Sequence, residues 1–595
     1  MGNPQPSLEL ASRRLFTGPK PAATLPERLM SLDKVRELYQ QAKELEGGSI
    51  HDRLLESLQV TYHVQAEDLS RVPPKGPVIV VANHPFGMLE GPILGSLMPK
   101  LRPDVKVMTN YLLSAMPELA GFCIFVDPFG GSDAARANLR AMKEAIQWMK
   151  KGGMLVIFPA GEVSHWSPRT RAVEDPEWSG TVARLIEITG AGALPMYFEG
   201  SNSLRFQLLG MIHPRLRTAS LANEFLNKRG ARVDIRFGRL IGPEKLAALG
   251  GAGEVTEYLR WRTYLLGERG PSQRRVFAFP KAAPSEPEPV IAQVPPVVLA
   301  AELSTLPPES TLESTREFSV HIAGAEQIPN ILREIGRLRE LTFRAAGEGT
   351  GRPLDLDRYD AYYEHLFVWN QQTREVAGAY RLARTDRVAA DRGVRGLYSR
   401  TLFQFDKRLL ERMGPALELG RSFVRPEYQR QFAPLLLLWK GIGRYVARYP
   451  ETATLFGAVS ISADYSEASR ELLVRYFQMH DHRDELSGLI KPKRPYRTQG
   501  WDRQALSRLL KDLDDLAAPI SDLERDGKGI PVLVRQYAKL GGRILGFSVD
   551  PGFGNCVDGL ILVDLRKTDR VVLERYLSRE GASAFLAFHQ AADAA

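Results

Sequence analysis

A chain of 595 residues is too long for one hydrophobic core, so its length predicts two or more domains. The composition, 44% hydrophobic and 25% charged, is that of a folded soluble protein. The formal net charge of +9 favours an acidic partner (a carrier protein, an anionic lipid surface or nucleic acid), and a merely solvated Arg-rich surface is an equal alternative.

Only two cysteines occur, Cys123 and Cys556, which excludes a disulfide framework and a cysteine-based zinc site and suits a reducing compartment. The N-terminus lacks the apolar core of a secretory signal. No apolar run reaches the ~20 residues that span a bilayer. We therefore expect a cytoplasmic protein, at most peripheral on a membrane.

The first half predicts a helical lead followed by an α/β domain. Within residues 1–60, apolar residues recur at helical spacing from Leu29 to Leu45. Over residues 61–279, short apolar strands alternate with amphipathic helices, which predicts a largely parallel sheet. The expected strands are 77–82, 105–109, 123–126, 154–158, 193–198 and 233–237, with helices at 133–151 and 179–189.

Residues 280–315 are rich in Pro, Ala, Ser and Glu, which predicts an extended linker because repeated prolines break helices and deny sheet hydrogen bonds. Residues 316–595 carry a mixed pattern that predicts an α+β domain. Its expected helices are 328–342 and 434–449, and its expected strands are 366–369, 375–381, 416–424, 455–461, 532–540 and 560–563.

The first candidate site follows the strand 78–81, which ends at Asn83-His84, with Glu90 a few residues later. Ligands of α/β sheets bind at the carboxyl ends of the strands. A histidine beside a carboxylate can act as a general base, because the carboxylate fixes the imidazole tautomer and stabilises the imidazolium. A capping Asn-His with a solvated Glu is the alternative.

Three further strand ends should open on the same edge of the sheet. One leads into the turn Phe158-Pro159-Ala160-Gly161-Glu162, whose backbone N–H groups can receive an anion or oxyanion. The others are the segments 124–127 and 194–200.

This pattern resembles the glycerolipid acyltransferase superfamily, the PlsC-like group. Its hallmark is Asn-His-x4-Asp, followed by a Phe-Pro-Glu-Gly-Thr block and a later Pro block, and the order matches over about residues 60–240. The resemblance implies the glycerolipid acyltransferase fold, with His84 as general base and Glu90 as its orienting carboxylate. It also implies that the acceptor binds to Asn83, Phe158, Pro159, Gly161 and Glu162.

The chain departs from that family at the groups that meet phosphate. Five residues, instead of four, separate His84 from its carboxylate, which is Glu90 instead of an Asp. Asp127-Pro128 stands where the family has an Arg, and the block that reads Phe-Pro-Glu-Gly-Thr in the family reads Phe-Pro-Ala-Gly-Glu here. These departures argue against glycerol phosphate as the acceptor.

The second candidate site lies in residues 316–595. Glu418 and Arg421 fall inside a β-like run, where charges are costly to bury unless they are paired. Surface charges on edge strands are the alternative, which is stronger for Asp355 and Arg358.

The second half resembles the GNAT-like N-acyltransferases that use acyl carrier protein, including the ornithine N-acyltransferases. The shared motifs are Arg-x3-Phe, Asp-x2-Asp, Gly-x2-Arg and Glu-x2-Arg. The resemblance implies a catalytic role for Glu418 and Arg421, with a base in the Glu418/Asp357 region. It implies substrate binding by Arg339, Asp357, Asp360, His365 and Arg381.

Residues 429–434 replace the Gly-rich pyrophosphate loop of coenzyme A-dependent enzymes and contain no glycine. An acyl carrier protein does not need that loop. The basic run 491–497 is a candidate docking patch for it, and a solvated loop is the equal alternative.

Together the halves resemble the bifunctional ornithine lipid synthases. This resemblance implies N-acylation of ornithine with a 3-hydroxyacyl group from acyl carrier protein, then O-acylation of the 3-hydroxyl by the first domain. It implies no metal or other cofactor, a lipid substrate, contact with the inner membrane surface through the N-terminal amphipathic helices, and no nucleic-acid partner. The alternatives are another amino acid such as glycine, a lysophospholipid acyltransferase, or a catalytically silent lipid- or carrier-binding protein.

Overall fold

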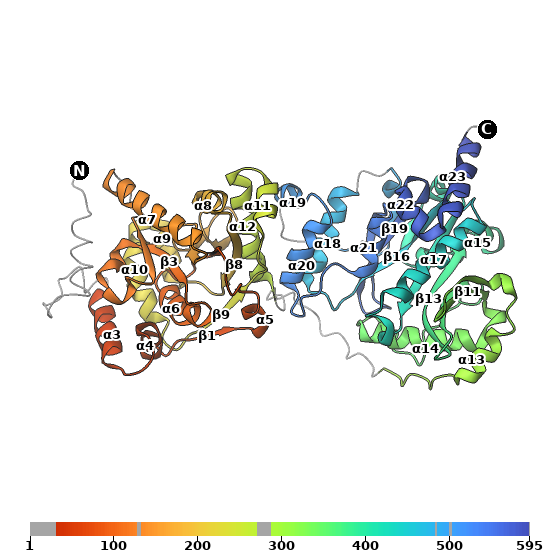
Figure 1. Ribbon diagram of the computed structural model, residues 1–595, viewed down its shortest axis with the longest axis horizontal. Coiled ribbons are helices and arrows are strands. Elements are labelled where there is room, and N and C mark those ends of the chain that lie inside the picture. Colours follow the sequence, from red (N-terminus) through yellow and green to blue (C-terminus); the bar gives the residue numbers. More distant parts are fainter. Residues whose placement is uncertain (1–30, 128–131, 270–286, 482–484, 499–502, 594–595) are drawn as a thin grey trace. The chain divides into compact units, whose positions relative to one another are not determined.

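The computed structural model describes residues 31–127, 132–269, 287–481, 485–498 and 503–593. Its contacts divide the chain into an N-terminal unit that ends at Arg269 and a C-terminal unit that begins at Gly270 (Figure 1). In the described residues, no helix combines the length and the hydropathy that a membrane span requires.

The N-terminal unit is built on a seven-stranded sheet of order β1-β9-β8-β2-β5-β3-β4. The pairs within β8-β2-β5-β3-β4 and the pair β1-β9 are parallel, and β9 is antiparallel to β8. The strands are β1 Thr61–Val64, β2 Val78–Ala82, β3 Val105–Asn110, β4 Cys123–Val126, β5 Met154–Ile157, β8 Gly192–Phe198 and β9 Arg232–Phe237. The α/β fold with a largely parallel sheet is therefore confirmed.

Helices surround this sheet because each connection between parallel strands must cross a face of it. The central strand β2 is buried at every residue, as expected for a strand covered on both faces. The helices are α3 Leu32–Glu44, α4 Ile50–Ser57, α5 Ala66–Leu69, α6 Glu90–Leu101, α7 Ser132–Lys150, α8 Thr181–Thr189, α9 Leu204–Ile212, α10 Pro214–Asn227, α11 Pro243–Leu249 and α12 Ala252–Leu265. A small antiparallel pair, β6 His165–Ser167 and β7 Ala172–Glu174, follows β5.

The C-terminal unit is built on an eight-stranded sheet of order β10-β11-β12-β13-β15-β16-β19-β18, in which only β15 and β16 pair in parallel. The strands are β10 Thr311–Ser314, β11 Phe318–Gly324, β12 Glu364–Asn370, β13 Glu375–Arg384, β15 Ala416–Val424, β16 Thr454–Ile461, β18 Arg543–Asp550 and β19 Cys556–Asp564. This mixed sheet confirms the α+β class.

Two long helices, α14 Pro329–Ala345 and α17 Phe432–Arg448, cover opposite faces of this sheet. Phe367 belongs to the apolar cluster that α14 completes, whereas Leu366 approaches Gly441 of α17. Neighbouring residues of a strand point to opposite faces. The remaining helices are α13 Pro296–Leu303, α15 Thr385–Arg392, α16 Lys407–Met413, α18 Glu467–His480, α19 Arg503–Leu509, α20 Ala517–Leu523, α21 Val532–Lys539, α22 Arg570–Leu577 and α23 Arg579–Asp593. A short pair of strands, β14 Phe403–Phe405 and β17 Ile490–Pro492, lies outside the main sheet.

The prediction that 280–315 is an extended linker is wrong from residue 296 onward, whereas the described residues 287–295 form neither helix nor strand. Residues 296–303 form α13 and residues 311–314 form β10. Pro296 occupies the first position of α13, where a proline costs no hydrogen bond, and Leu299 is fully buried in the core of the C-terminal unit. Prolines at such positions start a helix and do not signal an unfolded tether.

The predicted strand at 532–540 is also wrong, because Val532–Lys539 is the helix α21. Val534 and Tyr537 are its buried residues, and their spacing of three is helical. The β-branched Val-Leu-Val start favoured a strand, but the helical burial pattern prevails.

Candidate active sites

His84 and Glu90 meet at the carboxyl end of β2, in the N-terminal unit. The chain leaves the strand through Pro85 and Gly87 and returns as α6, whose first residue is Glu90. Gly87 has a φ of 88°, and a Cβ there would lie 2.6 Å from Val163, so only glycine fits this turn. The turn brings Glu90 Oε1 within 3.1 Å of His84 Nδ1.

The Glu90 carboxylate is completely buried and held by the turn itself. Its Oε1 also accepts hydrogen bonds from the backbone N–H groups of Phe86 at 2.7 Å and Gly87 at 3.2 Å. The N-terminus of α6 further favours a negative charge there. With Nδ1 directed at Glu90, the Nε2 atom of His84 is the one left to take a proton from an acceptor hydroxyl.

Phe158 and Asp175 fix the histidine from two other sides. The Phe158 ring stacks on the imidazole with centroids 4.3 Å apart. Asp175, which the sequence analysis missed, is buried, and its Oδ1 accepts the backbone N–H of His84 at 3.1 Å and the Ser164 hydroxyl at 2.5 Å. Nothing in the local sequence around Asp175 marks it, because only the fold brings it to His84.

The surroundings set the pKa of His84 above its ordinary value. Burial alone would lower this pKa, but the charge and hydrogen bond of Glu90 and the charge of Asp175 outweigh burial. The pKa of Glu90 is lowered: burial opposes this, while His84 and the backbone N–H of Phe86 favour the carboxylate. Both shifts favour an imidazolium beside a carboxylate, so the neutral imidazole that acts as a base forms only above the raised pKa of His84.

Two residues of the predicted acceptor site have other roles. The Asn83 side chain donates to the Phe198 carbonyl at 3.0 Å and accepts its N–H at 2.7 Å, so it ties β2 to β8. Glu162 forms an ion pair with Arg217 of α10 at 2.5 Å. Gly161 closes the turn with φ 66° and donates its N–H to the Phe158 carbonyl. Pro159 accepts the N–H of Ser179.

Replacing Glu90 by glutamine should move the acidic limb of the O-acylation pH profile to lower pH. The base works only as neutral imidazole, so the rate rises with pH through the His84 pKa, and loss of the Glu90 charge lowers that pKa. The rate itself should fall by about 10²-fold or more. Steady-state rates across pH check this, with the exposed Glu187→Gln on α8 as control. An unmoved limb would remove Glu90 from the assigned role.

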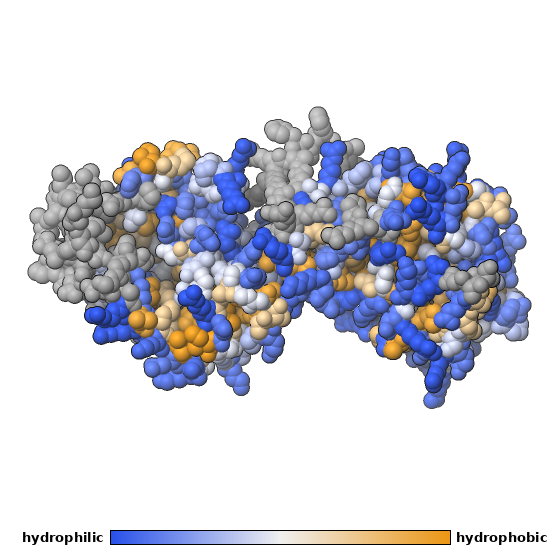
Figure 2. Space-filling model, turned by 90° about the horizontal axis from the view of Figure 1, so that it is seen from above, coloured by the Kyte–Doolittle hydropathy of each residue, from blue (hydrophilic) through white to orange (hydrophobic). Residues whose placement is uncertain are grey.

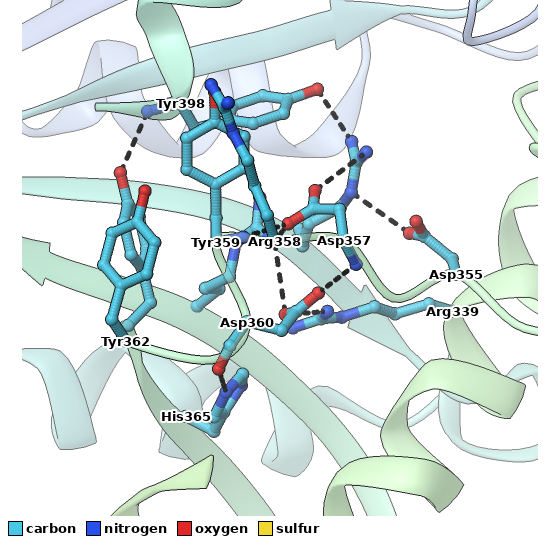
Figure 3. A network of polar contacts seen from close by, with 12 residues as sticks. Arg339, Asp355, Asp357, Arg358, Tyr359, Asp360, Tyr362, His365 and Tyr398 are labelled. Atoms are coloured by element: carbon cyan, nitrogen blue, oxygen red, sulfur yellow. Dashed lines mark hydrogen bonds and ion pairs between the residues drawn. The ribbon is translucent and has the colours of Figure 1, made fainter. Parts of the chain in front are cut away.

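The second predicted site forms a buried ionic network in the loop between α14 and β12 (Figure 3). Arg339 donates to Asp360 at 2.7 Å, and Arg381 donates to Asp357 at 2.7 Å and lies 3.2 Å from Asp360. His365 is fully buried, with Nε2 2.9 Å from the Asp360 carbonyl oxygen. Burial, with the charge of Arg339, lowers its pKa to about 4, so it is neutral. The structure therefore brings these five predicted residues together, and it closes Arg339, His365 and Arg381 off from solvent.

Arg421 joins this network, and Asp355 is its partner. Its Nε lies 3.1 Å from Asp355 Oδ2, and its Nη1 donates to the Tyr398 hydroxyl at 3.0 Å. Arg421 has a φ of 48° at a register shift between β13 and β15, which turns its side chain toward the loop. The surface-charge alternative is wrong for Asp355, which is buried, while Arg358 is exposed.

Glu418 does not pair with Arg421. Its carboxylate accepts the Tyr363 hydroxyl and the backbone N–H groups of Tyr398 at 3.1 Å and Ser399 at 2.7 Å. Glu418 therefore fixes the loop that carries Tyr398, and its catalytic role stays a prediction. Asp357 is likewise engaged by Arg381.

Next to Arg421, the parallel strands β15 and β16 separate. Their pairing runs from Ala416–Thr454 to Glu418–Phe456 and stops, although β15 continues to Val424 and β16 to Ile461. The separated edges present backbone groups that can hold an extended amide-bearing chain such as the arm of an acyl thioester.

Comparisons with known proteins agree with both folds. Residues 30–270 match the family model described as acyltransferase, and residues 338–440 match the acetyltransferase (GNAT) domain. A glycine N(alpha)-acyltransferase of Phocaeicola vulgatus is 32% identical over 46% of this chain and 88% of the relative. An L-ornithine N(alpha)-acyltransferase of Brucella abortus is 28% identical over 43% of this chain and 89% of the relative. A lyso-glycine lipid O-acyltransferase of Phocaeicola vulgatus is 27% identical over 36% of this chain and 76% of the relative.

The two folds with their sites define an acyltransferase with a PlsC-like unit followed by a GNAT unit. The chain belongs to the family of the amino-acid N(alpha)-acyltransferases, to which it adds the PlsC-like unit.

Proposed function

We propose that this chain makes an aminolipid in two acyl transfers. The C-terminal unit N-acylates an amino acid with a 3-hydroxyacyl group, and the N-terminal unit then acylates the 3-hydroxyl of that product. The observation that carries the proposal is the presence in one chain of both kinds of relative, an amino-acid N-acyltransferase and a lyso-aminolipid O-acyltransferase. Each covers less than half of the chain, as expected if each corresponds to one unit.

The acceptor of the first unit fits this order of steps. Its hydroxyl loses a proton to His84 Nε2 while its oxygen attacks the thioester carbonyl, and Glu90 stabilises the imidazolium. A lyso-aminolipid carries a hydroxyl and no phosphate, in agreement with Asp127-Pro128 in place of the phosphate-directed arginine. Neither transfer requires a metal or another cofactor, because a base and polarised carbonyl suffice.

Acyl carrier protein is the proposed donor for the N-acylation. The segment 429–434 that leads into α17 contains no glycine to cradle a pyrophosphate. The basic residues Lys491, Lys493, Arg494 and Arg497 are all exposed and can meet an acidic carrier.

Ornithine is the proposed amino acid, and glycine is the second candidate. The glycine N(alpha)-acyltransferase relative has the higher identity, 32% against 28% for the ornithine relative, and the O-acyltransferase relative acts on a lyso-glycine lipid. Parallel assays of the purified chain with each amino acid and a 3-hydroxyacyl carrier protein decide between them. Failure of both acceptors would sink the proposal.

The membrane surface is proposed to meet the hairpin formed by α9 and α10. Leu204 and Ile212 are 75% and 73% exposed, and Met211 lies between them in the chain. The hairpin adjoins the His84 site, because Gln207 of α9 accepts the Trp166 N–H and Arg217 of α10 pairs with Glu162. Figure 2 shows hydrophobic residues gathered in patches on the face that it draws.

The triple variant Leu204→Ser, Met211→Ser and Ile212→Ser should bind vesicles of phosphatidylethanolamine and phosphatidylglycerol about 10²-fold more weakly. Each exposed side chain contributes on the order of 1 kcal/mol when it enters the apolar phase, and 1.4 kcal/mol is tenfold. Flotation with vesicles measures this. The matched control replaces Val532 and Val571, exposed residues of the C-terminal unit, by serine. Equal binding by the triple variant and the control would contradict the assignment.

A further inference from the structure

Two buried carboxylates, Glu348 and Asp558, belong to segments that adjoin the part of β16 that β15 does not pair with. Asp558 is on β19, opposite Ser460 of β16, in the part of β16 that β15 no longer pairs with. Glu348 is in the loop after α14. Neither residue belongs to the four motifs named above for the second half, and Figure 3 labels neither.

The loop of Glu348 is fixed against the end of β16. The Ser462 hydroxyl donates to the Ala346 carbonyl, and the Glu348 N–H donates to the Phe343 carbonyl at 2.7 Å. Gly554 fits closely against the loop, since a Cβ there would lie 1.9 Å from the Gly347 carbonyl oxygen. The position of Glu348 is therefore set by packing on three sides.

The Glu348 carboxylate is buried without a hydrogen-bond partner among the described residues. The residue is 8% exposed and Asp558 is 4% exposed. Asp558 accepts the Ser460 hydroxyl at 2.9 Å, whereas no ion pair or hydrogen bond of the described residues satisfies the Glu348 side chain. A buried polar group without a partner is costly and calls for a ligand that supplies donors.

The two carboxylates share one environment with Arg421 and Tyr398. Burial, with the charge of Asp558, raises the pKa of Glu348 to about 8, although Arg421 opposes this. Burial likewise raises the pKa of Asp558 to about 6. The charge of Arg421 lowers the pKa of the Tyr398 hydroxyl, and the charge of Asp558 raises it. Two acids of unequal pKa beside the separated strands are arranged for binding a cation and moving its proton.

We propose that Glu348 and Asp558 receive the α-ammonium group of the acceptor amino acid and that Glu348 takes its proton. This inference rests on the proposed N-acylation. An ammonium group carries three N–H donors, and the unpaired Glu348 carboxylate beside Asp558 has no donor to accept from among the described residues. The charge of the bound ammonium favours the ionised form of Glu348, so the site gains its base as the acceptor binds.

The reaction then balances without another reactant. Glu348 removes one proton from the ammonium, and the neutral amine nitrogen attacks the thioester carbonyl carbon. The N–C bond forms as the C–S bond breaks, and the second amine proton passes to the leaving thiolate. The products are the amide, the free thiol and a proton on Glu348 that returns to water.

The test compares N-acylation by the full-length chain and by Glu348→Gln, with 3-hydroxyacyl carrier protein and either ornithine or glycine. We expect kcat to fall by about 10²-fold or more at neutral pH. The deficit should shrink as pH rises, because the free amine no longer needs a base. Asp558→Asn should raise KM for the amino acid. Asp564→Asn, at the other end of β19, is the matched control and should leave both constants unchanged.

Unchanged N-acylation by Glu348→Gln overturns the inference, and so does a loss that is equal at every pH, since that is the mark of a structural role. Glu348→Asp, which keeps the carboxylate, should retain more activity than the glutamine variant and serves if the latter does not fold. Thermal unfolding and O-acylation of the same samples report on folding. If the wild type acylates neither amino acid, the proposed function is wrong. If the wild type is active and its activity does not depend on Glu348, only this assignment is wrong.

Discussion

Replacing His84 by alanine should lower O-acylation of a lyso-aminolipid by about 10²- to 10⁴-fold, the range of general acid–base catalysis. The imidazole is the only group that the described structure places against Glu90 Oε1 apart from the backbone N–H groups of Phe86 and Gly87. Its loss removes the base and leaves a buried carboxylate beside the vacated space. Steady-state rates with a 3-hydroxyacyl amino acid and an acyl thioester measure the effect.

The same His84→Ala sample carries its own control, because N-acylation by the C-terminal unit should be unchanged. His84→Gln tests the chemistry more narrowly, since glutamine can still bond to Glu90 but cannot take the proton. It should be as inactive as the alanine variant in O-acylation. O-acylation at the wild-type rate in either variant would contradict the role of His84.

Replacing Arg381 by alanine should destabilise the C-terminal unit by about 3–5 kcal/mol, the cost of leaving a buried charge unpaired. Arg381 is 0% exposed and holds Asp357 at 2.7 Å and Asp360 at 3.2 Å. Arg339 still reaches Asp360, but Asp357 loses its closest partner. For a unit of this size the thermal midpoint should fall by roughly 4–7 °C.

Arg408→Ala is the matched control, because its ion pair with Asp406 is exposed and screened by solvent. Calorimetry separates the two variants, and O-acylation by the other unit serves as an internal reference. A midpoint for Arg381→Ala no lower than that of Arg408→Ala would show that the network contributes little to stability.

Both fold classes could be predicted from the sequence because their core strands are short apolar runs between helical patterns. β2, β5 and β8 are buried along almost their whole length, so hydrophobicity alone reveals them. β1 reads Thr-Tyr-His-Val at the edge of its sheet and gives no such signal. Helix α13 could not be predicted from the sequence, because its prolines favoured a linker although they lie where a helix begins and do not break it.

The contacts of the first site could be predicted better than those of the second, because His84 and Glu90 are six residues apart on one turn. Local sequence therefore holds their geometry. The partners of the second site come from distant segments, so the spacing of charges within one strand did not predict them. Glu418 and Arg421 are three residues apart in the sequence, yet Glu418 binds backbone N–H groups and Arg421 binds Asp355. The pairs His84–Asp175 and Glu348–Asp558 exist only in the folded chain.

The central claim is that one chain performs both transfers, and lipid mass spectrometry of a host without aminolipids tests it most directly. Expression of the wild-type chain should yield a lyso-aminolipid and its diacylated product, and His84→Ala should yield the lyso-aminolipid alone. A diacylated aminolipid in the His84→Ala host, or no new aminolipid with the wild type, would contradict the account.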